Sequence, residues 1–161
     1  MTNKLFLRAL LISAIAISLN STHICHAFTL RVSAVGSVLG TWKGESICVG
    51  NRAACKNEVA VYRFESIPGK SNVVLLFADK IIEGQRVPMG KLEFQYNEAR
   101  GELSCDFSRG QTHGLWQFKI SGDTMVGTLV LLPDKELVRD VKVRRVKESE
   151  VPKAPGKDQY E

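Results

Sequence analysis

The stretch 38–48, Val-Leu-Gly-Thr-Trp-Lys-Gly-Glu-Ser-Ile-Cys, has the alternation of a β-strand. Successive side chains of a strand point to opposite sides, so one face carries Trp42, Gly44, Ser46 and Cys48. The other face is mostly polar. A strand with a large aromatic side chain near its start needs partner strands that bury this side chain.

Short apolar runs alternate with turn-forming clusters after this stretch, and no segment keeps a helical period. We therefore predict strands over 38–49, 58–65, 73–82, 85–96, 102–107, 115–120, 124–132 and 136–147. Short turns between consecutive strands favour an up-and-down meander. Closure of the meander removes its unpaired edges, so the predicted fold is all-β: a single antiparallel up-and-down barrel of about eight strands.

Local features of these strands carry further predictions. Pro88 lacks an amide hydrogen, so the fourth strand is expected to be an edge or to contain a bulge or a break. Gly127 predicts a bend or the close approach of another segment. Residues 73–77 are apolar on both faces, which predicts that the lead-in segment or a partner covers the outer face. Segment 108–114 is expected to be the longest polar loop.

The first 27 residues have the order of a secretory signal peptide: basic residues Lys4 and Arg8, an apolar run over 10–19, and a small residue at Ala27. The apolar run is about half of the roughly 20 residues that span a bilayer. We predict cleavage near Ala27 and an exported protein, periplasmic or secreted, with no membrane span after cleavage. An uncleaved N-terminal anchor is the alternative.

The 161 residues suit a leader and one domain. Segment 28–37 is interpreted as a lead-in, either a short helix or a strand that plugs one end of the barrel. The barrel domain is predicted over 38–147. Segment 148–161 has two prolines, a glycine and few apolar residues, which predicts a disordered tail.

Three cysteines follow the predicted leader. Cys48 and Cys55 flank a short polar loop between two strands, and the oxidising compartment allows a disulfide there. Closure of so short a loop would contribute about 2–3 kcal/mol. Cys105 alternates in phase with Leu103 and Phe107, which predicts a buried free thiol. A reactive or intermolecular thiol is the alternative.

The charge balance does not indicate a nucleic-acid partner. Removal of Lys4 and Arg8 reduces the 22 basic residues to 20, against 17 acidic ones. The densest basic run, 142–147, contains valines and no aromatic residues, as a strand with a solvated face does.

Residues for chemistry are scarce, and we predict no enzymatic activity, no cofactor and no metal site. His113 is the one histidine after the leader; it lies near Asp106 and Ser108 and is interpreted as a solvated loop residue. No nucleophile elbow or phosphate-binding glycine loop occurs in the sequence. Strand alternation predicts a solvated position for most of four carboxylates, Glu45, Glu58, Asp79 and Glu83.

The motif Gly40-Thr41-Trp42 at the start of the first strand resembles the Gly-x-Trp opening of the lipocalins and their calycin relatives, including the avidins. In these families the tryptophan lies across the closed end of the barrel. A basic side chain of the last strand packs over it, a cation–π contact of about 1 kcal/mol. The resemblance implies that Arg145 closes the barrel with Trp42, since Arg145 has the parity of Val141 and Val143.

The wider pattern also resembles uncharacterised bacterial exported proteins, and small periplasmic barrels that inhibit secreted metalloproteases are related by analogy. The resemblance covers roughly 38–147. It does not extend to a set of biotin-binding residues.

Two functions are predicted for such a barrel. The first is the binding of a small apolar ligand at the end away from Trp42. The second is a protein-interaction barrel with a solid core, such as an inhibitor of a secreted hydrolase, with contacts from 28–37 or the disulfide loop. A chain this short favours a packed interior over a cavity. The candidate lining is aromatic: Tyr62, Phe64, Phe77, Phe94, Tyr96, Phe107, Trp116 and Phe118.

Overall fold

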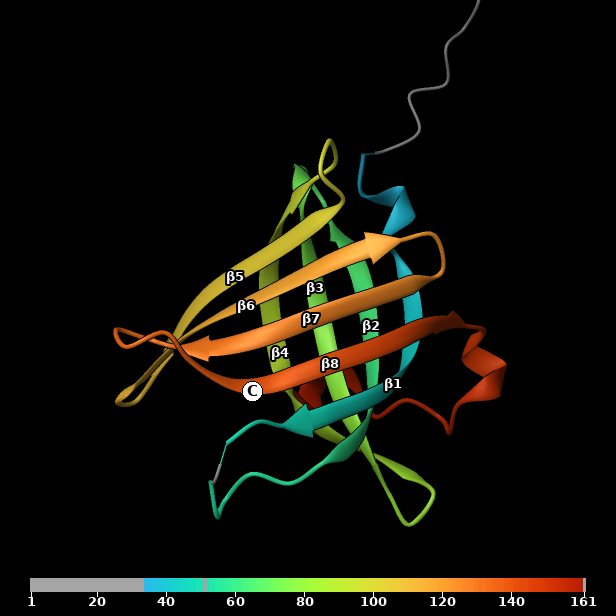
Figure 1. Cartoon of the computed structure of the whole chain (residues 1–161). Helices are drawn as coiled ribbons and strands as arrows, with labels where there is room; N and C mark the ends of the chain where they lie inside the picture. Colours follow the sequence, from blue (N-terminus) through green and yellow to red (C-terminus); the bar gives the residue numbers. More distant parts are fainter. Residues whose placement is uncertain (1–33, 51, 161) are drawn as a thin grey trace, which may run out of the picture. The chain divides into compact units, whose positions relative to one another are not determined.

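The chain forms an eight-stranded antiparallel barrel in a computed structural model that describes residues 34–50 and 52–160 (Figure 1). The predicted signal peptide 1–27 and residues 28–33 of the lead-in lie outside the described residues. The predicted fold class is confirmed. The strands are β1 Gly40–Cys48, β2 Glu58–Ile67, β3 Lys70–Ile82, β4 Gln85–Asn97, β5 Glu102–Arg109, β6 Thr112–Ser121, β7 Thr124–Leu131 and β8 Glu136–Val146.

Each strand pairs with the next one in sequence, and β8 pairs with β1 to close the barrel. In Figure 1, β5–β8 cross the barrel at a slant, whereas β2–β4 run steeply behind them. The end at which β1 begins is called the closed end, and the end with the β1–β2 loop is called the open end. Within the described part of the chain, no helix is long and apolar enough to cross a membrane.

Trp42 lies at the closed end and is completely buried. Its indole N–H donates to the carbonyl of Val38 at 2.9 Å. The guanidinium carbon of Arg145 lies 4.2 Å from the centroid of its ring, and the two residues are paired across β1 and β8. The contact that the calycin resemblance implies is therefore present.

Arg145 also holds the segment that precedes β1. It donates to the carbonyl oxygens of Leu39, at 2.6 Å, and of Ser37. This segment forms a short 3₁₀-helix, η1 (Ala34–Ser37), and places Val35 in the core at 1% exposure. The described part of the lead-in is thus helical and lies at the closed end.

Aromatic rings fill the closed half of the barrel. Phe94 makes an edge-on contact with Phe64 at 6.0 Å and lies 5.6 Å from Phe118 between ring centroids. Gly127 of β7 lies against the ring of Phe118, and a Cβ at this glycine would lie 2.1 Å from a ring carbon. The close approach predicted from Gly127 is confirmed, and a ring takes the space.

The prediction made from Pro88 is confirmed, whereas the prediction for the β5–β6 turn is not. β4 has a bulge next to Pro88. Ala78 of β3 pairs with Gly90, whereas the next residue, Asp79, pairs with Pro88, so the register shifts between them. In the β2–β3 turn, Gly69 follows Pro68 and has a φ of +80°, the conformation that a type II turn requires at this position. The prediction of a long loop over 108–114 is wrong, because β5 and β6 stay paired as far as Arg109 and Thr112. Backbone pairing extends through polar residues here, since both faces near a hairpin tip are solvated.

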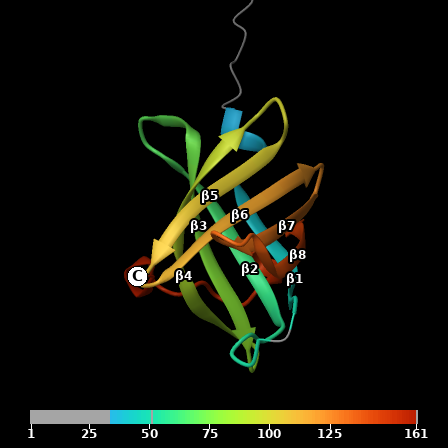
Figure 2. The ribbon, with the colours of Figure 1, turned by 60° about the vertical axis from the view of Figure 1, so that its left-hand side comes forward.

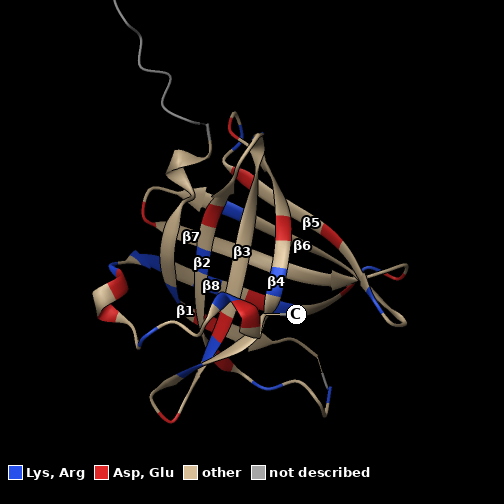
Figure 3. Cartoon of the chain, turned by 180° about the vertical axis from the view of Figure 1, so that it is seen from behind, with Lys and Arg blue, Asp and Glu red and all other residues tan. Residues whose placement is uncertain are grey.

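The C-terminal residues 148–160 are packed against the barrel, so the prediction of a disordered tail is wrong for them. They contain two short 3₁₀-helices, η2 (Glu148–Glu150) and η3 (Lys157–Gln159). From behind, the C-terminal end lies in front of β3 and β4 (Figure 3). Lys157 pairs with Glu65 of β2 at 2.6 Å, and Tyr160 is 1% exposed.

Tyr160 explains why this segment is ordered. Its ring makes an edge-on contact with Phe77 on the outer face of β3, with centroids 5.0 Å apart. Its hydroxyl donates to Asp79 Oδ1 at 2.6 Å. Asp79 also pairs with Arg86 at 2.6 Å, and Arg86 reaches Glu148 at 2.6 Å. One aromatic side chain thus covers a buried ion pair that would otherwise face solvent.

The predicted cover over the outer face of β3 is therefore the chain's own C-terminal segment. The lead-in segment or a partner was expected in this role, but the described part of the lead-in, residues 34–37, lies at the closed end. Asp79 is fully buried, so the expectation of a solvated carboxylate is wrong for it.

The pairing of β4 with β5 is much shorter than the other pairings. The two strands share three ladder pairs, which join 95–97 to 102–104 near the closed end. Toward the open end, no ladder pair joins them among the residues that the structure describes. Figure 2 shows β5 running at a steep angle to β4. We call this unpaired part, β4 residues 85–94 facing β5 residues 105–109, the β4–β5 seam.

Candidate ligand-binding site at the open end

The open half of the barrel encloses a cavity of about 430 Å³. Small side chains leave this space: Ser46, Ala78 and Gly90 occupy inward positions where the closed half has aromatic rings. The apolar walls come from Leu76, Ala78, Met89, Leu92, Phe107, Trp116 and Phe118. The expectation of a packed interior is therefore wrong for the open half, and the volume is within the usual range for small-molecule sites.

The structure divides the eight aromatic lining candidates into three groups. Tyr62, Phe107, Trp116 and Phe118 line the cavity. Trp116 and Phe118 form a stacked pair, with centroids 5.5 Å apart and planes 6° apart.

The other four candidates do not line the cavity. Phe64 and Phe94 belong to the packed closed half. Tyr96 meets Ser37 there, with 2.6 Å between the two hydroxyl oxygens. The prediction that Phe77 lines the cavity is wrong for a different reason. Phe77 lies on the outer face of β3 under Tyr160, because its side chain alternates with those of Leu76 and Ala78, which point inward.

Arg139 of β8 is the polar centre of the cavity. One of its amino groups donates to Ser46 Oγ at 2.7 Å and to Glu58 Oε2 at 3.0 Å. The other donates to the carbonyl of Lys56 at 3.2 Å. The side chains of Arg139 and Glu58 are 16% and 15% exposed. The ion pair therefore joins β8, β1 and β2 at the mouth of the barrel.

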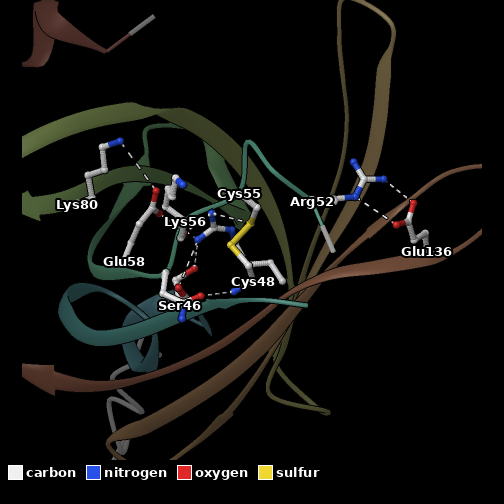
Figure 4. Close-up of a disulfide and its surroundings, with 10 residues drawn as sticks. Ser46, Cys48, Arg52, Cys55, Lys56, Glu58, Lys80 and Glu136 are labelled. Carbon is white, nitrogen blue, oxygen red and sulfur yellow. Dashed lines mark hydrogen bonds and ion pairs between the residues drawn. A yellow bond between two sulfur atoms is a disulfide. The ribbon is translucent and has the colours of Figure 1, made fainter. Parts of the chain in front are cut away.

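The Cys48–Cys55 disulfide, which confirms the predicted pairing, lies beside this polar group (Figure 4). Arg139 also contacts Cys55 Sγ at 3.6 Å, and Arg52 of the same loop pairs with Glu136. The loop is thus tied to β8 from two sides. Its described residues form part of the rim, and none of them is among the residues that line the cavity.

Tyr62 places a hydroxyl at the inner part of the cavity. Burial raises its pKa to about 12, although a hydrogen bond with Ser46 and the charge of Arg139 act in the opposite direction. The phenol is therefore neutral at physiological pH and serves as a hydrogen-bonding group. The cavity combines apolar walls with the Arg139–Glu58 ion pair, the Tyr62 phenol, two serines and two further basic residues, Lys91 and Arg109. Its largely apolar walls suit the binding of a mainly apolar molecule.

Sequence reasoning missed Arg139 and Glu58, although the required signal was present. Arg139 has the parity that identified Arg145, and Glu58 alternates in phase with Ala60 and Tyr62. The expectation of a solvated Glu58 is wrong, because Glu58 lies on the same face of β2 as Ala60 and Tyr62, which is the inner face. Inward charges at the ends of strands are stabilised by partners from neighbouring strands, and these partners cannot be identified from one strand alone.

His113 lies outside the cavity. Its Nε2 is 2.7 Å from Asp106 Oδ1, and the two side chains are 47% and 64% exposed. Ser108 is opposite His113 in the ladder. Among residues 34–50 and 52–160, no three His, Cys, Asp or Glu side chains are grouped to hold a metal ion.

Cys105 is a free and buried thiol, as expected. Burial raises its pKa, and the nearby Asp106 carboxylate acts in the same direction. Both effects favour the protonated thiol over the nucleophilic thiolate.

Comparisons with known proteins add no further constraint. The sequence matches no protein family, no curated protein and no solved structure at a significant level. The eight-stranded antiparallel barrel is consistent with a calycin-like fold.

Proposed function

We propose that this protein is an exported, non-enzymatic barrel that binds a small apolar ligand in the open half of its interior. The observation that carries the proposal is the cavity of about 430 Å³ with walls formed mainly by Leu76, Met89, Leu92, Phe107 and Trp116. Release of bound water and contact with these side chains would favour an apolar molecule.

The alternative, a protein-interaction barrel such as a hydrolase inhibitor, was based on a solid core. The cavity removes that premise, and no surface among the described residues identifies a protein partner. We therefore retain ligand binding alone as the proposed function. Export is a second component of the proposal and rests on the N-terminal sequence pattern.

Titration with N-phenyl-1-naphthylamine, an uncharged apolar dye, tests the binding. Protein purified from cells that express the full chain is expected to bind one dye per chain with energy transfer from tryptophan. Trp116→Phe should retain binding and reduce the transfer, because it removes the one tryptophan that lines the cavity and leaves Trp42 as the only donor. The mass of the purified protein also tests export, since cleavage near Ala27 would give an N-terminus near Phe28.

Two matched variants give the decisive comparison. Ala78→Phe places a ring in the cavity and should abolish dye binding. Val59→Phe adds a ring on the outer surface, where Val59 is 43% exposed, and should leave binding unchanged. Absence of saturable binding by the folded wild-type protein, or equal binding by both variants, would refute the proposal.

A further inference from the structure

The β4–β5 seam opens the cavity through the side of the barrel. Where strands are paired, the lining takes alternate residues, such as Leu76 and Ala78 on β3 or Trp116 and Phe118 on β6. At the seam the lining takes consecutive residues instead: 89–92 on β4 and 107–109 on β5. Consecutive side chains point to opposite faces of a strand, so the cavity reaches the strand edges and not only their inner faces.

Missing backbone pairing is the reason for this opening. β4 and β5 pair over 95–97 and 102–104 and diverge beyond these residues. The bulge opposite Ala78 and the proline at position 88 lie on the diverging part of β4. Proline cannot donate a hydrogen bond to a neighbouring strand, so this segment is poorly suited to pair with β5.

Two basic residues flank the seam, one on each strand. Lys91 of β4 and Arg109 of β5 both line the cavity. Neither forms a salt bridge with another side chain in the part of the chain that the structure describes. The third cation of the lining, Arg139, differs because it is paired with Glu58 at 3.0 Å.

The charges of the lining therefore do not balance. Glu58 is the one carboxylate among the lining residues, and both Arg139 and Lys80 lie within 4.0 Å of it. Lys91 and Arg109 remain as the uncompensated charges. They lie beside an apolar cavity, where a partly desolvated anion would interact with them more strongly than in water.

We propose that the ligand is an anionic amphiphile whose acidic group lies at the β4–β5 seam between Lys91 and Arg109, with its apolar body in the cavity. The inference rests on the proposed ligand binding and adds the chemical class of the ligand and the position of its charge. A carboxylate, sulfonate or sulfate on an apolar body would satisfy the same geometry. Arg109 offers a planar fork of donors and Lys91 a mobile ammonium group.

Two dyes with the same ring system separate the two proposals. 8-Anilinonaphthalene-1-sulfonate carries a sulfonate, and N-phenyl-1-naphthylamine lacks it. The wild-type protein is expected to bind the anionic dye at least tenfold more tightly at low ionic strength. This preference should decrease in 1 M salt, because exposed charges are screened. Binding of the neutral dye should not decrease with salt.

Lys91→Gln/Arg109→Gln should weaken binding of the anionic dye tenfold or more and change binding of the neutral dye less than twofold. Lys142→Gln/Arg144→Gln is the matched control, since it removes the same charge from exposed positions of β8. This control should bind both dyes like the wild type.

The outcomes are distinguishable. Failure of the neutral dye to bind the folded protein would overturn the proposed function. Binding of the neutral dye without preference for the anionic one, or equal effects of the two double variants, would overturn this inference alone. Charged side chains on unpaired strands can also prevent association between sheets. If the Lys91→Gln/Arg109→Gln variant dimerises and still prefers the anionic dye as the wild type does, the two residues prevent association between sheets and do not bind the ligand. This result would also overturn the inference.

Discussion

Tyr160→Phe tests whether the C-terminal segment is an integral part of the fold. The substitution removes one hydroxyl group and keeps the ring against Phe77. The lost hydrogen bond spans 2.6 Å to Asp79 Oδ1, and both residues are at most 1% exposed. Asp79 keeps its ion pair with Arg86, but Oδ1 loses its donor, and water cannot replace it without local opening.

A hydrogen bond to a charged group contributes about 1.5–3 kcal/mol. We expect Tyr160→Phe to lower the free energy of unfolding by this amount, which corresponds to a fall in Tm of roughly 5–12 °C for a domain of this size. Tyr160→Ala also removes the buried ring and should cost about 3–5 kcal/mol. Urea unfolding followed by tryptophan fluorescence and circular dichroism measures both values.

Tyr96→Phe is the matched control. It removes another phenol hydroxyl, 2.6 Å from Ser37 Oγ, but here both partners are neutral. The expected loss is about 0.5–1.5 kcal/mol. If Tyr160→Phe and Tyr160→Ala both change stability by less than about 0.5 kcal/mol, the segment does not protect the Asp79–Arg86 pair and the reasoning fails.

Three further predictions follow from the same structure. Arg145→Met removes the cation–π contact and the donors to the carbonyl oxygens of Ser37 and Leu39, and should lower the free energy of unfolding by roughly 2–4 kcal/mol in the same assay. Replacement of Cys48 and Cys55 by serine should cost about 2–3 kcal/mol without loss of the barrel signal in circular dichroism, and a full unfolding of the variant at 25 °C would contradict this. At alkaline pH, stability should fall from about pH 10 to about pH 12 by roughly 3 kcal/mol, because Tyr62 ionises more easily when unfolded. Tyr62→Phe should reduce this loss, and an unchanged pH profile would argue against the buried phenol.

The sign of the alkaline effect follows from the protonation states. The folded state keeps Tyr62 neutral up to about pH 12, whereas an unfolded tyrosine ionises near pH 10. The stabilisation is therefore complete below pH 10 and is lost as the pH rises through this interval. Tyr160 acts in the same direction, because burial and the Asp79 carboxylate raise its pKa well above the usual value.

Alternation and turn chemistry in the sequence were sufficient to predict the barrel. Side chains of a strand alternate with a period of two, so parity indicated the burial of Trp42. Its contact with Arg145 was implied by the calycin resemblance, with parity selecting the residue of the last strand. The disulfide followed from two cysteines that flank a short polar loop between consecutive strands. These features depend on a few neighbouring residues and on pairing between consecutive strands, which a meander provides automatically.

The site depended on information from several strands at once. The cavity exists because small residues of β1, β3 and β4 meet at the same level of the barrel, and no single strand reveals this level. The β4–β5 seam depends on how far two strands stay paired, and local propensity does not determine the length of a ladder. Arg139 and Glu58 point inward because each has its partner on another strand.

The C-terminal segment shows most clearly the difference between what local sequence predicts and what tertiary contacts decide. Its composition predicts disorder, because it has too few apolar residues to form a core of its own. Only the tertiary structure supplies what Tyr160 needs: the ring of Phe77 and the ion pair of Asp79 with Arg86 on the outer face of the barrel. The sequence by itself therefore determined the strands and their order, since these follow local periodicity. The tertiary structure decided where the barrel is hollow, where it opens and what covers it, because these depend on contacts between residues far apart in the chain.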